Sequence, residues 1–303
     1  MGNSSTKLAV IGASSMVGSR FCEQQNKFPL VKADLNGEIS VDLTKPDSLE
    51  DFFKKYEFGA IILFSAFTDV DAAEKERNNK NGIAWKINVK GVEEITRLCK
   101  EYSRKLIFIS TDFVFDGESG PYAEDDGIGK NLEKISWYGI TKINAEQKIK
   151  ELTTNYLIVR IAYPYRSRFL EKDDFAKQIL KKFNEGTLYP MFTDQIITPT
   201  YIDDIEPAIN LLLEKNSQGI FHVASPTPTT PFAFAENLLT KFGKDSKLLK
   251  EGSLVDLLKN NTVTPRPVSG GLLVDKISNL GITLASWQDG ITKIFEDSQG
   301  QLI

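Results

Sequence analysis

Short apolar runs alternate with amphipathic segments along the first half of the chain. Most runs are apolar at consecutive positions, which is typical of parallel strands buried on both faces. Between them, apolar residues recur three and four positions apart, the spacing of one helix face. The pattern predicts strands at 8–11, 31–34, 39–44, 60–64, 105–110 and 156–161, and helices at 19–25, 48–56, 83–102 and 137–151. This alternation predicts an α/β fold with a parallel sheet and right-handed crossovers.

The rhythm changes after Tyr165. The pattern there predicts helices at 174–184, 203–213 and 232–242, a strand around Phe221, and irregular connections. The expected fold class is α/β, a Rossmann-type doubly wound parallel sheet with a smaller C-terminal substrate lobe. We expect an NAD(P)-binding domain at 1–165 together with about 200–225, and a substrate-binding lobe at about 166–199 and 226–303.

The first expected strand leads into a turn of small residues and then a helix. Gly12 and Gly18 stand at the ends of a Gly-x-x-Ser-x-x-Gly spacing, with Ser15 and Met16 between them. Small residues let the backbone approach a pyrophosphate, and the following helix N-terminus offers free N–H groups and a positive dipole end. The turn predicts a dinucleotide site. The alternative is a helix that starts tightly against a strand without any phosphate.

Asp34 stands where a dinucleotide fold places its ribose-binding acid, about twenty residues past the first glycine. An acid there binds the 2′-hydroxyl and favours NAD over NADP. Asn36-Gly37 follows at once and is a hairpin-type turn signal, so Asp34 is equally consistent with a turn residue. Asp42 and Leu43, near the end of the next expected strand, would lie beside the adenine.

Three side chains of complementary chemistry follow the expected strand 105–110. Thr111 comes directly after it, and Tyr138 and Lys142 lie four apart on an expected helix, so both face the same way. Hydride transfer to a ketone leaves a developing alkoxide that needs a proton and hydrogen bonds. We expect Tyr138 to give the proton and Thr111 to aim the carbonyl oxygen. Lys142 is expected to lower the pKa of the phenol and to hold the nicotinamide ribose.

Two polar residues in apolar surroundings have open roles. Asn88 lies in the middle of the expected helix 83–102, where it either faces solvent or makes an internal polar contact. His222 is the only histidine and lies in a strand-like run, without the Gly-x-Ser-x-Gly elbow of a hydrolase. A core or strand-end position is the favoured interpretation of His222.

Composition narrows the classes of partner. The net charge of −4 at pH 7 argues against a general nucleic-acid binder, which normally carries a basic surface. No run approaches the roughly 18 apolar residues of a membrane span, and no signal-peptide pattern opens the chain. The 2 cysteines and 1 histidine indicate neither a disulfide framework nor a metal site. We therefore expect a cytoplasmic protein that uses no metal and binds neither nucleic acid nor membrane.

Taken together, these motifs resemble the extended short-chain dehydrogenase/reductases and, within them, the dTDP-4-dehydrorhamnose reductase branch. The resemblance covers nearly the whole chain. Its most diagnostic pieces are the run Val114-Phe115-Asp116-Gly117 and the pairs Asp194-Gln195 and Pro199-Thr200. Further pieces are 65–74, 88–89, 110–113, 121–122, 138–142 and 266–267.

The resemblance implies NADH- or NADPH-dependent reduction of the 4-keto group of a dTDP-linked 6-deoxyhexulose, the last step to dTDP-L-rhamnose. It implies that Thr111, Tyr138 and Lys142 are catalytic. With the residues derived above, the expected cofactor contacts are Gly12, Ser15, Met16, Gly18, Asp34, Asp42, Leu43, Ser65, Ala66, Phe67, Tyr138 and Lys142. The expected substrate contacts are Thr68, Val70, Asp112, Phe113, Gln195 and Arg266. The implied partner is a nucleotide sugar, and a homodimer is possible.

Some positions depart from the pattern of this branch. Ser15 replaces the central glycine, Ser65 replaces a usual asparagine, and Phe67 replaces a small residue. The loop before Tyr138 is also a few residues longer than usual. These departures bear on the sugar more than on the reaction type.

Related activities compete with reduction. The 4,6-dehydratases of the superfamily carry Thr-Asp-Glu, and Phe113 at the Glu position argues against dehydration. A nucleotide-sugar epimerase shares the Thr, Tyr and Lys set and remains an alternative. A non-catalytic NAD(P)-binding regulatory subunit is a further alternative, because such a protein can retain the same three residues.

Overall fold

The computed structural model describes residues 7–169, 171–260 and 262–302. Six parallel strands form its main sheet, in the order β2-β1-β3-β4-β5-β7. They are β1 (Leu8–Ile11), β2 (Leu30–Ala33), β3 (Ala60–Leu63), β4 (Lys105–Thr111), β5 (Tyr156–Ile161) and β7 (Gly219–His222). This confirms the predicted Rossmann-type sheet.

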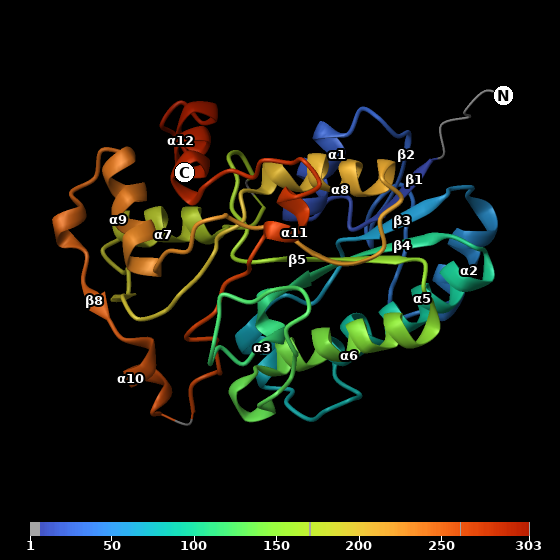
Figure 1. Cartoon of the computed structure of the whole chain (residues 1–303), viewed down its shortest axis with the longest axis horizontal. Helices are drawn as coiled ribbons and strands as arrows, with labels where there is room; N and C mark the ends of the chain where they lie inside the picture. Colours follow the sequence, from blue (N-terminus) through green and yellow to red (C-terminus); the bar gives the residue numbers. More distant parts are fainter. Residues whose placement is uncertain (1–6, 170, 261, 303) are drawn as a thin grey trace.

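Helices cover both faces of the sheet (Figure 1). One face carries α1 (Met16–Gln24), α8 (Ile205–Glu214) and α11 (Asp275–Ser278); the other carries α2 (Pro46–Lys55), α5 (Val92–Glu101) and α6 (Trp137–Leu152). Successive strand residues alternate between the two cores: Leu8 and Val10 pack in one, Ala9 and Ile11 in the other. Consecutive apolar residues are therefore needed, because both faces are buried.

Between β3 and α5 the chain forms three short helical segments. They are α3 (Val70–Glu74), α4 (Ile83–Trp85) and a π-helical segment, Lys86–Gly91. The predicted helix 83–102 is thus continuous in direction but contains a π-helical turn. Shorter 3₁₀ turns lie at Asp112–Val114, Leu132–Lys134, Ile202–Asp204 and Ser246–Leu248.

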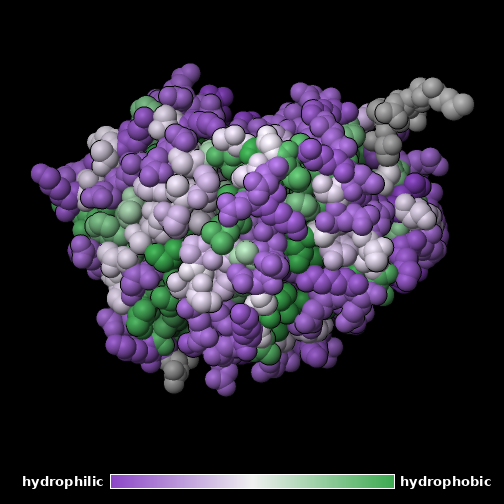
Figure 2. Space-filling model, viewed as in Figure 1, coloured by the Kyte–Doolittle hydropathy of each residue, from purple (hydrophilic) through white to green (hydrophobic). Residues whose placement is uncertain are grey.

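A second group of helices packs around a core of its own, beside the sheet in Figure 1. It contains α7 (Phe175–Asn184), α9 (Pro231–Lys241) and α12 (Trp287–Asp297), together with α10 (Leu254–Leu258) and the two-stranded pair β6 (Met191–Phe192) and β8 (Glu251–Gly252). The face shown in Figure 2 is largely hydrophilic, with apolar residues gathered in patches between α10 and α6. Across the described ranges, no helix has both the length and the apolar character that crossing a membrane requires.

The predicted strand 39–44 is wrong. A single isolated bridge pairs Ser40 of this segment with Asp34, the residue that follows β2. The carboxylate of Asp42 instead accepts hydrogen bonds from the Thr44 backbone N–H, at 2.9 Å, and from its hydroxyl, at 2.7 Å. These contacts fold the chain into a turn that leads to Pro46 at the start of α2, so the side-chain bonds replace strand pairing.

His222 lies at the end of β7 and is fully buried, which confirms the interpretation as a strand-end core residue. β7 is an outer strand of the sheet. Two side chains bind the backbone groups of β7 that are not paired with β5. Lys276 Nζ donates to the Ile220 carbonyl at 2.7 Å, and Glu124 Oε1 accepts from the His222 backbone N–H at 3.0 Å.

Candidate functional site

The carboxyl ends of β1 and β3 define the crevice of the fold. The chain runs from β1 outward to its neighbour β2 and then crosses to β3, which pairs with β1 on its other side. This reversal of strand order is where doubly wound sheets bind ligands. Gly12 follows β1, and Ser65 follows β3 and donates its N–H to the Ile11 carbonyl at 3.2 Å. The predicted Gly12 and Ser65 to Phe67 segments therefore meet at this crevice.

The turn from β1 into α1 is closed tightly by Ser15. Its hydroxyl donates to the Gly12 carbonyl at 2.7 Å and accepts from the Gly18 N–H at 3.1 Å, which makes Ser15 the N-cap of α1. A Cβ on Gly18 would lie 2.1 Å from the Gly12 carbonyl oxygen, so no side chain fits there. The backbone cradle and the helix N-terminus, with Met16 as the first residue of α1, fit a pyrophosphate.

Asp34 lies against this turn. Its Oδ2 accepts hydrogen bonds from the Ser14 backbone N–H at 2.9 Å and from the Ser14 hydroxyl at 2.7 Å. Asp34 also belongs to the turn that follows β2, because its backbone bridges Ser40 and its carbonyl accepts from Val41 at 2.9 Å. Asp34 is therefore a turn residue that also contacts the turn after β1, and its contact with a ribose stays a prediction. Asp42 and Leu43 follow Val41 in the chain, and their contact with the adenine stays a prediction.

Asn88 makes an internal polar contact, which resolves the open interpretation of this residue. It is buried in the π-helical segment. Its Oδ1 accepts from the Phe67 N–H at 2.8 Å, while Nδ2 donates to the Phe67 carbonyl and to the Thr141 hydroxyl, each at 3.0 Å. Asn88 therefore fixes the segment after β3 relative to α6, and π-helical turns of this kind are frequent at functional sites.

Thr111, Tyr138 and Lys142 come together at the junction of β4 and α6. Thr111 is the last residue of β4, and Tyr138 and Lys142 lie on successive turns of α6; all three are buried. The helix can start this close to the strand end because residue 139 is glycine: a Cβ there would lie 2.2 Å from the Phe113 carbonyl oxygen. Ser136 caps α6 by accepting from the Gly139 N–H at 3.2 Å.

The expected effect of Lys142 on the phenol is wrong for this structure. Lys142 Nζ donates to the Ile109 carbonyl at 2.8 Å and lies 3.8 Å from the centre of the Phe108 ring. Burial raises the pKa of Tyr138, Asp112 raises it further, and the nearby Thr111 hydroxyl opposes the change. Burial also lowers the pKa of Lys142 to about 7, against an opposing effect of Glu146.

Asp112 is a buried carboxyl group beside these residues, with 1% of its surface exposed. The Thr111 hydroxyl donates to its Oδ1 at 3.1 Å, while Oδ2 has no hydrogen-bond partner. Burial raises the pKa of Asp112 to about 7. Phe113 follows, and its ring centre lies 6.0 Å from that of Tyr138 and 6.2 Å from that of Tyr163. The polar groups of Thr111 and Asp112 thus lie next to the aromatic rings of Phe113, Tyr138 and Tyr163.

The other expected substrate contacts lie near Tyr163 or near α3. Gln195 is buried, and its Nε2 donates to the Tyr163 hydroxyl at 2.9 Å. Arg266 forms an ion pair with Asp71 at 2.9 Å. Thr68 Oγ1 accepts from Lys172 at 2.9 Å, and Val70 is the first residue of α3. The Arg266 and Lys172 contacts join the segments after β3 to the C-terminal half of the chain.

Sequence reasoning missed Tyr163 as part of this region and left the role of Asn88 open. Tyr163 follows β5 at the same edge of the sheet, which was an available signal. Its φ of 41° is unusual for a residue with a side chain, and it places the ring between Phe113 and Phe175. The π-helical turn around Asn88 had no such signal, because its pattern of apolar residues is that of an ordinary helix.

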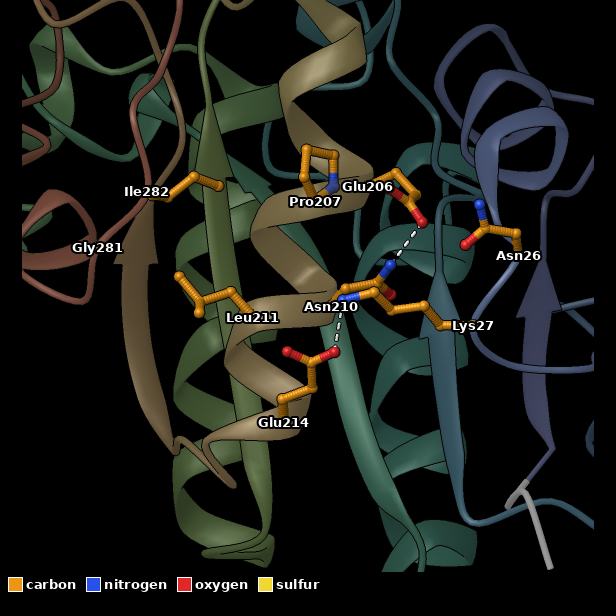
Figure 3. A pocket seen from close by; sticks show the side chains of 9 residues that line it. All are labelled: Asn26, Lys27, Glu206, Pro207, Asn210, Leu211, Glu214, Gly281 and Ile282. Atoms are coloured by element: carbon orange, nitrogen blue, oxygen red, sulfur yellow. Dashed lines mark hydrogen bonds and ion pairs between the residues drawn. The ribbon is translucent and has the colours of Figure 1, made fainter.

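A separate pocket lies on α8, across the sheet from α6 (Figure 3). Its polar side chains contact one another: Lys27 pairs with Glu214, and Asn210 donates to Glu206. None of the expected site residues lines it. The crevice at the carboxyl edge of the sheet is therefore the candidate site.

Comparison with known proteins identifies the family. The RmlD substrate binding domain family matches residues 6–299. A probable low-salt glycan biosynthesis reductase of Haloferax volcanii is 28% identical over 72% of this chain and 71% of its own length. A dTDP-4-dehydrorhamnose reductase of Aggregatibacter actinomycetemcomitans is 25% identical over 95% of this chain and 98% of its own. The crystal structure of the dTDP-4-dehydrorhamnose reductase from Bacillus anthracis in complex with NADP is 25% identical, covers 96% of this chain and 99% of its own, and superposes with a TM-score of 0.85. The fold, the crevice and these likenesses together show that the chain belongs to the RmlD substrate-binding domain family of extended short-chain dehydrogenase/reductases.

Proposed function

We propose that this protein is an NADH- or NADPH-dependent reductase of the 4-keto group of a dTDP-linked 6-deoxyhexulose. The observation that carries the proposal is the meeting of Thr111, Tyr138 and Lys142 at the carboxyl edge of the sheet whose strand β1 ends in the tight turn from Gly12 to Gly18. Relatives named dTDP-4-dehydrorhamnose reductase, and a solved one that holds NADP, support this activity. The helices around α7, α9 and α12 form the substrate-binding lobe in this proposal, and the sheet with its flanking helices forms the cofactor domain.

The backbone cradle at Gly12 to Gly18 holds the cofactor pyrophosphate, Asp34 faces the adenosine ribose, and Lys142 holds the nicotinamide ribose. The reduced nicotinamide supplies the hydride when it is bound. The Thr111 hydroxyl donates a hydrogen bond to the carbonyl oxygen of the sugar, in place of its present hydrogen bond to Asp112. Tyr138 gives its proton to the same oxygen as negative charge develops there. Burial of these groups excludes water, which strengthens their hydrogen bonds to the developing charge.

Reduction is favoured over dehydration by the surroundings of Phe113. Its ring packs against Tyr138 and Tyr163 at the position where the 4,6-dehydratases carry a carboxyl group. An apolar ring there supplies no acid or base. The expected locations and assemblies, a cytoplasmic enzyme that can form a homodimer, are part of the proposal, and size-exclusion chromatography with light scattering tests the assembly.

The test supplies purified protein with NADH or NADPH and a dTDP-4-keto-6-deoxy sugar in the presence of its 3,5-epimerase. We expect stoichiometric cofactor oxidation and a product two mass units heavier than the ketone. Tyr138→Phe should abolish turnover while cofactor binding persists. Absence of oxidation across a panel of nucleotide keto-sugars contradicts the proposal and favours a regulatory binding subunit. Tightly held NAD that is recycled without net consumption favours an epimerase.

A further inference from the structure

Glu146 continues the row of functional side chains along α6. Tyr138, Lys142 and Glu146 are each four residues apart, so they lie on successive turns of one helix face. All three are buried, and Glu146 has 0% of its surface exposed. A fully buried carboxylate is costly unless it is paired, so its partners indicate what it does.

The Glu146 carboxylate is held from two neighbouring strands. The Ser110 hydroxyl of β4 donates to Oε1 at 2.7 Å. Arg160 of β5 donates to both oxygens, from Nε to Oε1 at 3.0 Å and from Nη2 to Oε2 at 2.7 Å. This two-pronged contact fixes the carboxylate in place. Burial acts to raise the pKa of Glu146, but Arg160 and Ser110 overcome it and leave the pKa below its usual value, so the group is ionised.

Further charged and titratable groups surround this pair. Lys150 Nζ lies 3.8 Å from Glu146 Oε2, on the partly exposed side of α6. Arg160 Nη1 contacts His222 Nε2 of β7 at 3.3 Å, and His222 Nδ1 donates to the Leu273 carbonyl at 2.9 Å. Burial, with Arg160 next, lowers the pKa of His222 to about 3, so His222 is neutral and Nε2 accepts. The Glu124 carboxylate accepts a hydrogen bond from the His222 backbone N–H. Glu146 is the carboxylate of α6 that lies one turn from Lys142.

Lys142 depends on such a charge. Only 2% of its surface is exposed, and its contacts at Nζ are the neutral Ile109 carbonyl and the Phe108 ring. Neither contact carries a full negative charge. Asp112 acts on Tyr138 rather than on Lys142. A lysine that is to hold a ribose through hydrogen bonds from its ammonium group has to stay protonated in this setting.

We propose that Glu146 is a positioning residue of this site, which fixes α6 to β4 and β5 and places a negative charge one helical turn from Lys142. Its consequence for turnover rests on the proposed function, whereas its effect on Lys142 does not. The paired Arg160 guanidinium holds the carboxylate one turn away from Lys142, so the two side chains interact through charge without a direct hydrogen bond.

The test follows the Lys142 ammonium directly by NMR of protein labelled with [ε-¹³C]lysine, with its signal assigned from Lys142→Met. In Glu146→Gln, which keeps the size of the side chain, we expect the titration midpoint of Lys142 to fall by roughly one to two pH units. Glu146→Asp, which keeps the charge, should give a midpoint closer to that of the natural protein. The basic limb of the kcat/KM profile should move in the same direction as the midpoint.

Two further variants separate charge from structure. Glu146→Gln leaves Arg160 unpaired and can destabilise the fold, so the double variant Glu146→Gln/Arg160→Met removes both charges. Its Lys142 midpoint should still fall, but by less, because the positive charge of Arg160, which disfavours protonation of Lys142, is lost as well. Ser110→Ala removes one hydrogen bond to the carboxylate but keeps its charge, and should leave the Lys142 midpoint unchanged. An unchanged midpoint in both Glu146→Gln and the double variant overturns the proposal. If the midpoint falls but the natural protein reduces no keto-sugar, the proposed function fails and the role of Glu146 stands.

Discussion

The hydroxyl of Thr111 donates to the carboxyl group of its neighbour Asp112 at 3.1 Å, at the end of the central strand β4. The other oxygen of Asp112 is buried and has no partner. A substrate hydroxyl is the kind of group that would satisfy this oxygen, because a polar atom left unpaired in the interior costs free energy. The protonation state of Asp112 should therefore affect both the stability of the protein and its contact with the substrate.

Asp112→Asn should remove a pH dependence of stability. Burial raises the pKa of Asp112 to about 7. Between roughly pH 4 and pH 7 the unfolded chain has released this proton while the folded protein retains it, so the group lowers stability as pH rises through that range. The free energy of unfolding of the variant minus that of the natural protein should therefore be larger at pH 7.5 than at pH 4.5, by on the order of 3 kcal/mol. Urea unfolding at the two pH values measures this, and an equal difference at both would contradict it.

Asp34→Ser should shift the cofactor preference toward NADPH. The Asp34 carboxylate accepts hydrogen bonds from Ser14, in the turn proposed to bind the cofactor phosphates, where a 2′-phosphate would meet like charge. We expect NADH to be preferred by the natural protein, and the variant to change the ratio of kcat/KM values by about ten-fold in favour of NADPH. Ser14→Ala is the matched control, because it removes one hydrogen bond but keeps the charge. A ratio that stays the same in Asp34→Ser would show that Asp34 is only a turn residue.

Asn88→Ala should destabilise the protein by about 1 to 3 kcal/mol, since it leaves the partly buried Phe67 backbone groups without their partner. Turnover should fall as well, because the segment after β3 loses its anchor to α6. Asn144→Ala is the control: Asn144 also lies in a helix but donates only to the Ile140 carbonyl one turn earlier. Thermal and denaturant unfolding measure both variants, and equal losses would mean that the contact of Asn88 has no special weight.

Arg266→Ala should raise KM for the nucleotide sugar about ten-fold with a much smaller change in kcat, the pattern expected when a binding contact is lost. Arg266 is now paired with Asp71 across 195 positions of the chain. Asp71→Asn keeps the guanidinium and weakens only the ion pair, so its KM should change far less. Steady-state kinetics compares the two. If both variants raise KM equally, Arg266 acts through the ion pair rather than on the substrate.

The strands and the order of the site along the chain were predictable because a parallel sheet needs runs of apolar residues. β1, β3, β4 and β5 lie within a residue or so of the expected ranges. Residues 39–44 were misassigned because Val41 and Leu43 alternate with polar residues as a strand does, whereas Asp42 binds Thr44 and forms a turn. α12 was not predicted, since Trp287–Asp297 packs into a core assembled from distant segments.

The chemistry of the site was only partly predictable. The positions of Thr111, Tyr138 and Lys142 followed from one strand end and one helical spacing, which are local properties. The protonation behaviour of Tyr138 and Lys142 was not predictable, because it depends on burial and on Glu146. A role for Glu146 could be inferred only from the structure, in which Ser110 of β4 and Arg160 of β5 bind its carboxylate.

The contacts along β7 bear on how the protein behaves at high concentration. An outer strand presents main-chain groups to which a strand of another molecule can add, and such edges nucleate aggregates. Here the ammonium of Lys276 occupies the Ile220 carbonyl and the carboxylate of Glu124 occupies the His222 N–H. An incoming strand would have to displace both charged groups. The two side chains thus oppose the addition of a strand from another molecule. Lys276→Ala should lower the solubility limit of the protein and leave its activity unchanged.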